Sequence, residues 1–165
     1  MVGPGGPVLI VLLLGCGPRA KLELTEAYVS ATHRRVPQVE PADAAALVAS
    51  GKAVLVDVRP PEERDVSRIP GAIDREAVEA DPEAFGDVAL IAYCTVGQRS
   101  SDWARDQRAL GLDARNLEGS VLAWVWDGRE LEHDGAPTHR VHTWSADFAW
   151  VPPGWEAVFP VSPGP

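Results

Sequence analysis

The chain has 165 residues, with 15 Lys and Arg against 24 Asp and Glu, and a formal net charge of −9. Apolar residues make up 45 % and charged residues 24 % of it. This composition suits one globular domain with appendages and argues against a wholly disordered chain. A protein that binds nucleic acid must neutralise phosphates with its own Lys and Arg side chains. The acidic charge balance of this chain therefore predicts no nucleic-acid partner.

The chain opens with an apolar run, residues 8–14, that ends at Gly15-Cys16. A helix needs about 20 apolar residues to span a bilayer, so the run matches the apolar part of an export signal instead. Its ending resembles a bacterial lipobox, although no Lys or Arg precedes it and Leu14 is bulkier than usual there. We predict a signal peptide over residues 1–16, a lipid anchor on Cys16 and an exported, cell-envelope or periplasmic location. The alternative is a mis-started or cleaved N-terminus in which Cys16 has no role.

Residues 17–35 are interpreted as a linker with one short helix around 22–31, and a domain is expected over 36–134. Residues 41–51 begin with proline and end with glycine, which predicts a helix. The nearly continuous apolar run 53–58 is typical of a strand buried on both faces of a parallel sheet. A short acidic helix is expected from Pro60 onward.

The remaining elements continue this alternation. Strands are predicted at 72–73, 89–93 and 114–117, and helices at 76–85, 100–110 and 120–126. Strands that alternate with helices over short connections indicate an α/β domain around a parallel sheet. The tail, residues 135–165, is rich in Trp and Pro. It is expected to pack across the domain as irregular structure, with a partner-binding groove as the alternative.

Cys94 directly follows the predicted strand 89–93 and precedes a helix. Ligand sites of open α/β sheets lie at the carboxyl ends of strands. A short loop containing Gly97 can turn its backbone N–H groups inward, and the helix N-terminus and Arg99 add positive charge. All three favour the thiolate, which is a nucleophile, and the same loop would hold an anionic sulfur donor.

The alternative is that Cys94 is an inert buried cysteine at the end of a strand. The loop that follows it, with Gly97, Gln98, Arg99 and two serines, is too polar to form core, and this favours the reactive interpretation.

Three segments carry a resemblance to single-domain rhodaneses. The loop Cys94-Thr95-Val96-Gly97-Gln98-Arg99-Ser100 resembles their active-site loop. Residues 54–63, followed by Ile69-Pro70-Gly71-Ala72-Ile73, resemble the family's first signature, and residues 116–124 resemble its terminal signature. The resemblance spans about residues 36–132. One departure is Arg68, where family members often have His.

The resemblance implies an α/β fold with about five parallel strands flanked by helices. It also implies that Cys94 takes a sulfane sulfur from thiosulfate or a persulfide and passes it to cyanide, a thiol or a protein. Residues 95–100 would bind the substrate, and neither a metal nor an organic cofactor would be required. Asp57 and Arg59 would support the fold through buried polar contacts.

Two other functions compete with this interpretation. Phosphatases and arsenate reductases of the related fold need five residues between Cys and Arg, whereas four separate Cys94 from Arg99. A non-enzymatic binding module at the cell envelope is the second alternative, and the Trp-rich tail would support it. A metal site at His133, His139 and His142 is disfavoured, because Arg140 interrupts a simple ligand pattern.

Overall fold

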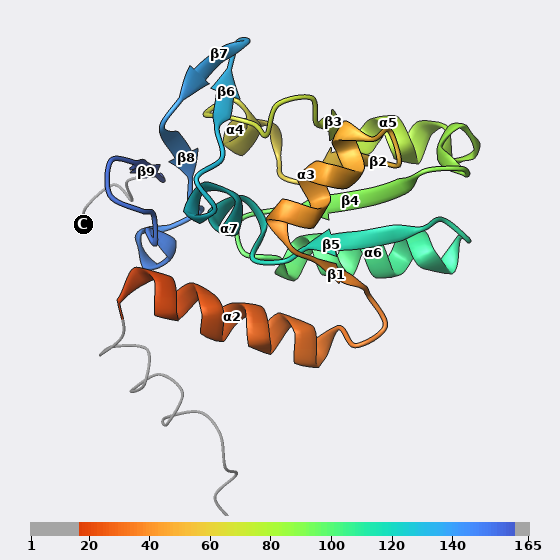
Figure 1. The fold of residues 1–165 in the computed structure, drawn as a ribbon, viewed down its shortest axis with the longest axis horizontal. Coiled ribbons are helices and arrows are strands. Elements are labelled where there is room, and N and C mark those ends of the chain that lie inside the picture. The colour runs from red at the N-terminus through yellow and green to blue at the C-terminus, as the bar shows by residue number, and fades with distance from the viewer. Residues whose placement is uncertain (1–16, 161–165) are drawn as a thin grey trace, which may run out of the picture.

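The computed structural model describes residues 17–160. It has an α/β fold built on a five-stranded parallel sheet with the strand order β1-β5-β4-β2-β3, as the alternation of predicted strands and helices indicated (Figure 1). The strands are β1 (Gln38–Val39), β2 (Ala53–Asp57), β3 (Ile73–Asp74), β4 (Ala89–Tyr93) and β5 (Ala114–Leu117).

Helices cover both faces of this sheet. One hydrophobic cluster includes residues of α3 (Pro41–Ala49) and α7 (Ser120–Trp126). The other includes residues of α5 (Arg75–Ala80) and α6 (Gln98–Ala109). Because side chains of a strand alternate between faces, Ile91 and Tyr93 of β4 join the first cluster, and Leu90 and Ala92 join the second. The nearly continuous apolar character of β4 follows from burial on both faces.

The predicted helix over residues 76–85 was wrong in one respect, because the structure divides it in two. Helix α5 ends at Ala80, and a short 3-10 helix, η1 (Pro82–Phe85), follows. Between them Asp81 has φ −146° and ψ 73°, outside the helical region. A residue before proline is disfavoured in helical geometry, so Pro82 ends the first helix. The short acidic helix is α4 (Pro61–Arg64).

The segment predicted as a linker holds a longer helix than expected, α2 (Pro18–Thr32). Leu22 and Val29 lie two turns apart on one face and are buried against the rest of the molecule. The Glu26 side chain of this helix reaches Gly119 at the start of α7, where an added Cβ would collide with its carboxylate. At its other end the ring of His33 lies 3.3 Å from Asp102 of α6. Helix α2 is therefore packed against the domain.

The C-terminal tail is less irregular than predicted. After the hairpin of β6 (Leu131–His133) and β7 (Ala136–Thr138), strand β8 (Arg140–His142) pairs in parallel with β9 (Glu156–Val158). A 3-10 helix, η2 (Ala146–Phe148), lies in the connection. Phe148, Trp150 and Trp155 pack against the first core cluster. The tail thus packs against the first core cluster, and a pair of short strands joins its two ends.

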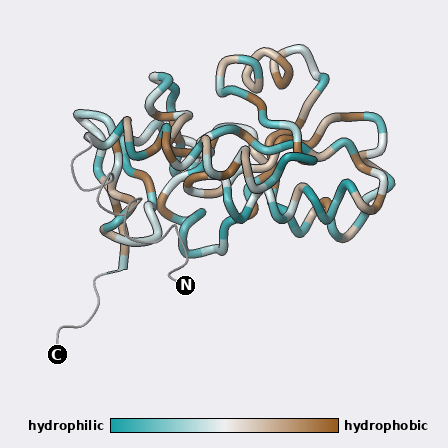
Figure 2. Tube along the Cα trace, turned by 90° about the horizontal axis from the view of Figure 1, so that it is seen from below, coloured by the Kyte–Doolittle hydropathy of each residue, from teal (hydrophilic) through white to brown (hydrophobic). Residues whose placement is uncertain are grey.

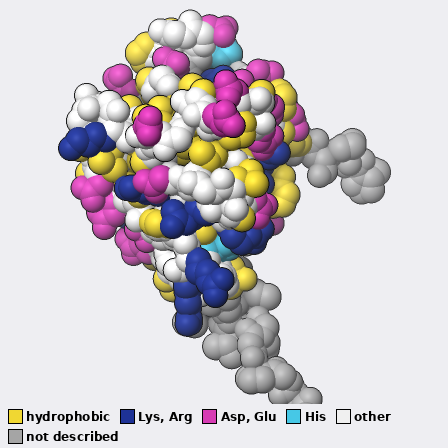
Figure 3. Space-filling view, turned by 90° about the vertical axis from the view of Figure 1, so that its right-hand side faces the viewer, with side chains coloured by type: hydrophobic (Ala, Val, Ile, Leu, Met, Phe, Trp, Pro, Cys, Tyr) yellow, Lys and Arg dark blue, Asp and Glu magenta, His cyan; other side chains and the backbone are white. Residues whose placement is uncertain are grey.

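Figure 2 shows hydrophilic and hydrophobic residues interspersed along the tube. Figure 3 shows one face on which acidic and basic side chains mix with small apolar patches. Within residues 17–160, no helix combines the length and the apolar character that crossing a bilayer requires.

Candidate active site

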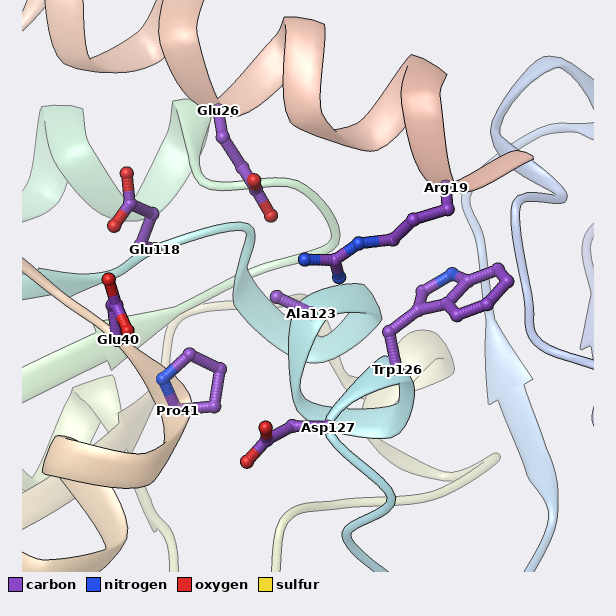
Figure 4. Close-up of a pocket in the computed structure, with 8 residues that line it drawn as sticks. All are labelled: Arg19, Glu26, Glu40, Pro41, Glu118, Ala123, Trp126 and Asp127. Carbon is purple, nitrogen blue, oxygen red and sulfur yellow. The ribbon is translucent and has the colours of Figure 1, made fainter. Parts of the chain in front are cut away.

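Two pockets near α2 differ in chemistry. One, of about 320 Å³, lies between α2, α3 and α7 and is lined by Arg19, Glu26, Glu40 and Glu118 among others. Figure 4 shows the Arg19 guanidinium reaching toward it from α2, with carboxylates on the opposite side. Burial raises the pKa of Glu26. The lining of this first pocket includes no cysteine, serine or other nucleophilic side chain. The second pocket, of about 590 Å³, contains Cys94 and is the candidate active site.

Cys94 sits at the carboxyl end of β4 and is 1 % exposed. The backbone N–H of Gly97 donates a hydrogen bond to its Sγ at 3.2 Å. Gly97 has φ +106°, a conformation that glycine adopts without the strain of a Cβ, and it caps α6. The loop predicted from the sequence therefore turns at Gly97 and directs a backbone donor at the sulfur.

Serine hydroxyls surround the thiol beneath the loop. Ser100 Oγ lies 3.4 Å from Sγ and 2.6 Å from Oδ1 of Asn116. Asn116 is oriented by its own Nδ2, which donates to Gln38 at 2.6 Å. Ser120 Oγ accepts the Cys94 N–H at 3.1 Å and lies 3.9 Å from Sγ. Since a hydroxyl has one proton, Ser100 can turn from Asn116 to the sulfur when negative charge develops there.

The net effect of these surroundings is a pKa of Cys94 below that of an ordinary thiol. Burial acts in the opposite direction and raises the pKa of this thiol. The positive charge of Arg99, the hydrogen bonds from Ser100 and the Gly97 N–H outweigh burial because they stabilise the thiolate. The site therefore favours the nucleophilic form of cysteine.

Arg99 is held by a carboxylate that the sequence analysis did not single out. Its Nη1 and Nη2 donate to Glu63 at 2.7 and 2.9 Å, and Nη2 also donates to Thr95 Oγ1 at 3.0 Å. Glu63 is 1 % exposed, whereas the Arg99 side chain is 38 % exposed. A buried carboxylate needs such a partner, so the pair positions Arg99 beside Cys94. The acidic start of α4 was the available sequence signal.

The structure brings the predicted loop residues together in two layers. Thr95, Val96, Gln98 and Arg99 line the pocket with Cys94. Gly97 and Ser100 are buried and contact the sulfur from below the pocket lining. The roles that the sequence analysis assigned to these residues stay predictions.

The outer walls of the pocket come from segments that the sequence analysis did not assign to the site. Helix α2 contributes Thr25 and Tyr28. The tail contributes four residues, namely Trp144, Asp147, Phe148 and Trp150. The Trp144 ring lies over the Arg99 guanidinium with 5.9 Å between them. An apolar tail without a clear period was the one signal in the sequence.

A buried polar network lies next to the site. Arg59 donates from Nε and Nη2 to Asp57 at 2.9 and 2.7 Å, and Tyr93 donates to Asp57 at 2.6 Å. The Tyr93 oxygen also accepts the N–H of Ile69 at 3.2 Å. These residues tie β2, β4 and the loop before β3 together.

Arg68, the departure from the family pattern, donates to Asp74 and Ala72 and is not among the residues that line the pocket of Cys94.

The three histidines considered for a metal site, His133, His139 and His142, have different surroundings. His133 is exposed near Asp134, and His139 packs on Trp155 with 5.0 Å between ring centres. His142 is buried, accepts the Trp144 N–H on Nδ1 at 3.1 Å and lies 4.0 Å from Glu63. Burial lowers its pKa, and the charges of Arg59 and Arg99 lower it further. His142 thus fixes the start of the pocket wall.

Cys16, the predicted lipidation site, lies outside the described residues.

Comparison with known proteins agrees with this geometry. Residues 40–126 match the rhodanese-like domain family. The human thiosulfate:glutathione sulfurtransferase is 32 % identical, over 54 % of this chain and 93 % of that protein. An HTH-type transcriptional regulator of Mycobacterium tuberculosis is 34 % identical over 53 % of this chain. The chain spans 41 % of the length of that regulator.

Solved structures show the same fold. A protein from Bacillus halodurans superposes with a TM-score of 0.53 at 22 % identity, covering 66 % of this chain and 85 % of that one. A protein of Rhodopseudomonas palustris, described as a possible tyrosine phosphatase, has a TM-score of 0.51 at 28 % identity. That match covers 79 % of this chain and all of the other.

Proposed function

The chain belongs to the rhodanese-like domain family, and we propose that it is a sulfurtransferase whose Cys94 carries a sulfane sulfur between a donor and a thiol acceptor. The observation that carries this proposal is the position of the Cys94 Sγ. It faces the pocket, accepts the Gly97 N–H at 3.2 Å, and has a lowered pKa. A lowered pKa increases the fraction of thiolate, and a thiolate can attack a sulfane sulfur without a separate base.

The reaction would take two balanced steps. With thiosulfate as donor, the Cys94 thiolate attacks the outer sulfur, the bond between the two sulfurs of thiosulfate breaks, and sulfite leaves. The Gly97 N–H and the Ser100 hydroxyl, which stabilise the thiolate, are also within reach of the persulfide that forms. An acceptor thiolate then attacks the outer sulfur of the persulfide and releases the Cys94 thiolate.

A phosphatase function is less well supported. The loop from Thr95 to Gln98 places four residues between Cys94 and Arg99. Arg99 is also engaged by Glu63 through both terminal nitrogens. A phosphatase would need this guanidinium to hold the phosphate during the reaction, whereas attack on the outer sulfur of a donor needs only the Cys94 thiolate. The Rhodopseudomonas relative, described as a possible phosphatase, therefore does not change the proposal.

The test is the intact mass of the full chain after incubation with thiosulfate and removal of excess donor, measured without reductant. We expect a gain of one sulfur atom that maps to the peptide containing Cys94 and is removed by cyanide. The sequence contains two cysteines, so Cys16→Ser is the matched control and should still gain sulfur. Cys94→Ser should gain none while it retains its circular dichroism spectrum.

A persistent gain in Cys94→Ser would contradict the assignment of the nucleophile. No gain in the parent chain, with either thiosulfate or glutathione persulfide as donor, would contradict the enzyme and favour the binding-module alternative.

We further propose that the protein is exported and anchored by a lipid on Cys16, supported by the apolar run and the lipobox-like ending of residues 1–16. Expression in a bacterial host that processes lipoproteins should place the chain in the membrane fraction. Cys16→Ser should release it from that fraction. Equal distribution of both forms would contradict the anchor.

A further inference from the structure

The pocket above Cys94 is built largely by parts of the chain outside the family match. Of the eleven described residues that line it, six lie outside residues 40–126. Two come from α2 and four come from the segment 144–150 that follows β8. The sulfur-bearing loop thus lies within the family match, and more than half of the residues that line the pocket lie outside it.

This added surface is mainly apolar and aromatic. The pocket is lined by Tyr28, Trp144, Phe148 and Trp150, and by Val96 from the loop. The three aromatic side chains of the tail form a connected group, since Phe148 lies 6.1 Å from Trp144 and 5.0 Å from Trp150, ring centre to ring centre. Apolar walls with a few polar groups are typical of sites for small organic ligands.

The charge of the lining indicates that the added walls recognise an acceptor, because a small dianionic donor such as thiosulfate would gain little from them. Among the described residues that line the pocket, Arg99 is the cation, and both its terminal nitrogens are engaged by Glu63. Asp147 adds a carboxylate to the lining. The volume of about 590 Å³ is also within the range of organic ligands and far exceeds a molecule of a few atoms.

Trp144 points to a ligand in a second way. Its side chain is exposed, at 60 %, although its area is large and apolar. Its φ is +64°, which is unusual for a bulky residue and costs conformational energy. The Trp144 N–H bond to His142 Nδ1 holds this conformation. Strained, exposed aromatic residues of this kind gather at ligand sites.

We infer that the sulfur acceptor is a small organic thiol with an apolar, preferably aromatic, body, which Tyr28, Trp144, Phe148 and Trp150 contact during transfer. This inference rests on the proposed sulfurtransferase function. In the step, the acceptor thiolate attacks the outer sulfur of the Cys94 persulfide, and the bond from that sulfur to Sγ breaks. The acceptor leaves as an organic persulfide, and Cys94 returns to the thiolate, with no external oxidant or reductant.

The experiment uses the full chain loaded with sulfur at Cys94 in a first step that mass spectrometry quantifies. Two acceptors of similar thiol basicity, benzyl mercaptan and 2-mercaptoethanol, are then compared in single-turnover transfer. Matched basicity is needed because the thiolate fraction and its nucleophilicity set the intrinsic rate. We expect benzyl mercaptan to react faster by about tenfold, since burial of a phenyl group in an apolar pocket is worth at least that factor.

The variants Tyr28→Ala and Trp144→Ala should each reduce this rate ratio toward one. Both side chains are more than half exposed, so their removal leaves the core intact. The matched control is Leu110→Ala, an apolar residue 69 % exposed beyond the far end of α6, which should keep the parent ratio.

The outcomes separate the two proposals. A chain that does not load sulfur contradicts the sulfurtransferase function itself. A chain that loads sulfur but shows the same rate for both acceptors, or the same ratio in Tyr28→Ala and Trp144→Ala as in the parent, contradicts the acceptor class alone. In that case a protein thiol that reaches Cys94 without using the aromatic walls becomes the better occupant.

Discussion

Arg99 donates two hydrogen bonds to Glu63, from Nη1 at 2.7 Å and from Nη2 at 2.9 Å, across 36 residues of sequence. The pair holds a positive charge near Cys94 and at the same time partly neutralises it. Glu63 therefore acts as a positioning residue for Arg99, and its charge is expected to oppose a thiolate at Cys94.

Replacement of Glu63 by Gln should lower the pKa of Cys94 further. The negative charge of Glu63 disfavours a nearby thiolate, and its loss leaves the Arg99 charge unopposed. The pH profile of iodoacetamide alkylation, recorded in a Cys16→Ser background, should shift to lower pH. At a fixed pH below the parent midpoint, alkylation should be faster. The matched control is Glu62→Gln, the exposed neighbouring carboxylate, which should leave the profile in place. A shift to higher pH would mean that Arg99 turns away once its partner is neutral.

Gly97→Ala should weaken both the fold and the thiolate. At φ +106° an alanine is strained, at a cost of about 1–3 kcal/mol, and its Cβ would lie 3.1 Å from Nδ2 of Asn116. Relaxation of the loop would displace the N–H that donates to Sγ, so the alkylation profile should move to higher pH. Gly111→Ala is the control, since φ is +92° there and nothing lies within 4 Å of the added Cβ. Gly111→Ala should lose comparable stability in urea and leave the pKa of Cys94 unchanged. An equal change of this pKa in Gly97→Ala and Gly111→Ala would contradict the role assigned to the Gly97 N–H.

Tyr93→Phe should destabilise the protein by about 1–3 kcal/mol, because it leaves buried polar groups without a partner. Asp57 would lose its hydrogen bond at 2.6 Å, and the Ile69 N–H would lose its acceptor at 3.2 Å. Urea unfolding of the full chain measures this loss. Tyr28→Phe, at a tyrosine that is 55 % exposed, is expected to stay within about 0.5 kcal/mol of the parent. A loss below that level in Tyr93→Phe would show that the network does not contribute to stability.

Leu22→Ala tests whether α2 is part of the folded unit. Leu22 is fully buried in the first core cluster, so truncation should cost about 2–5 kcal/mol. Leu24, on the same helix, is 40 % exposed, and Leu24→Ala should cost well under about 1 kcal/mol. Thermal and urea unfolding would compare the two. Equal, small effects would support the linker that the sequence predicted for residues 17–35.

The sequence by itself determined the alternating strands and helices, because burial of parallel strands on both faces demands nearly continuous apolar runs such as 53–56 and 89–93. It also determined that the loop from Cys94 to Ser100 follows a strand and turns at Gly97, since local chemistry governs both. Only the tertiary structure decided which distant groups meet that loop. Glu63 meets Arg99, Asn116 meets Ser100, and the walls from α2 and residues 144–150 close the pocket of Cys94, all through packing across the chain. Such contacts leave no local period in the sequence, because their geometry arises only when the helices and the tail close over the sheet.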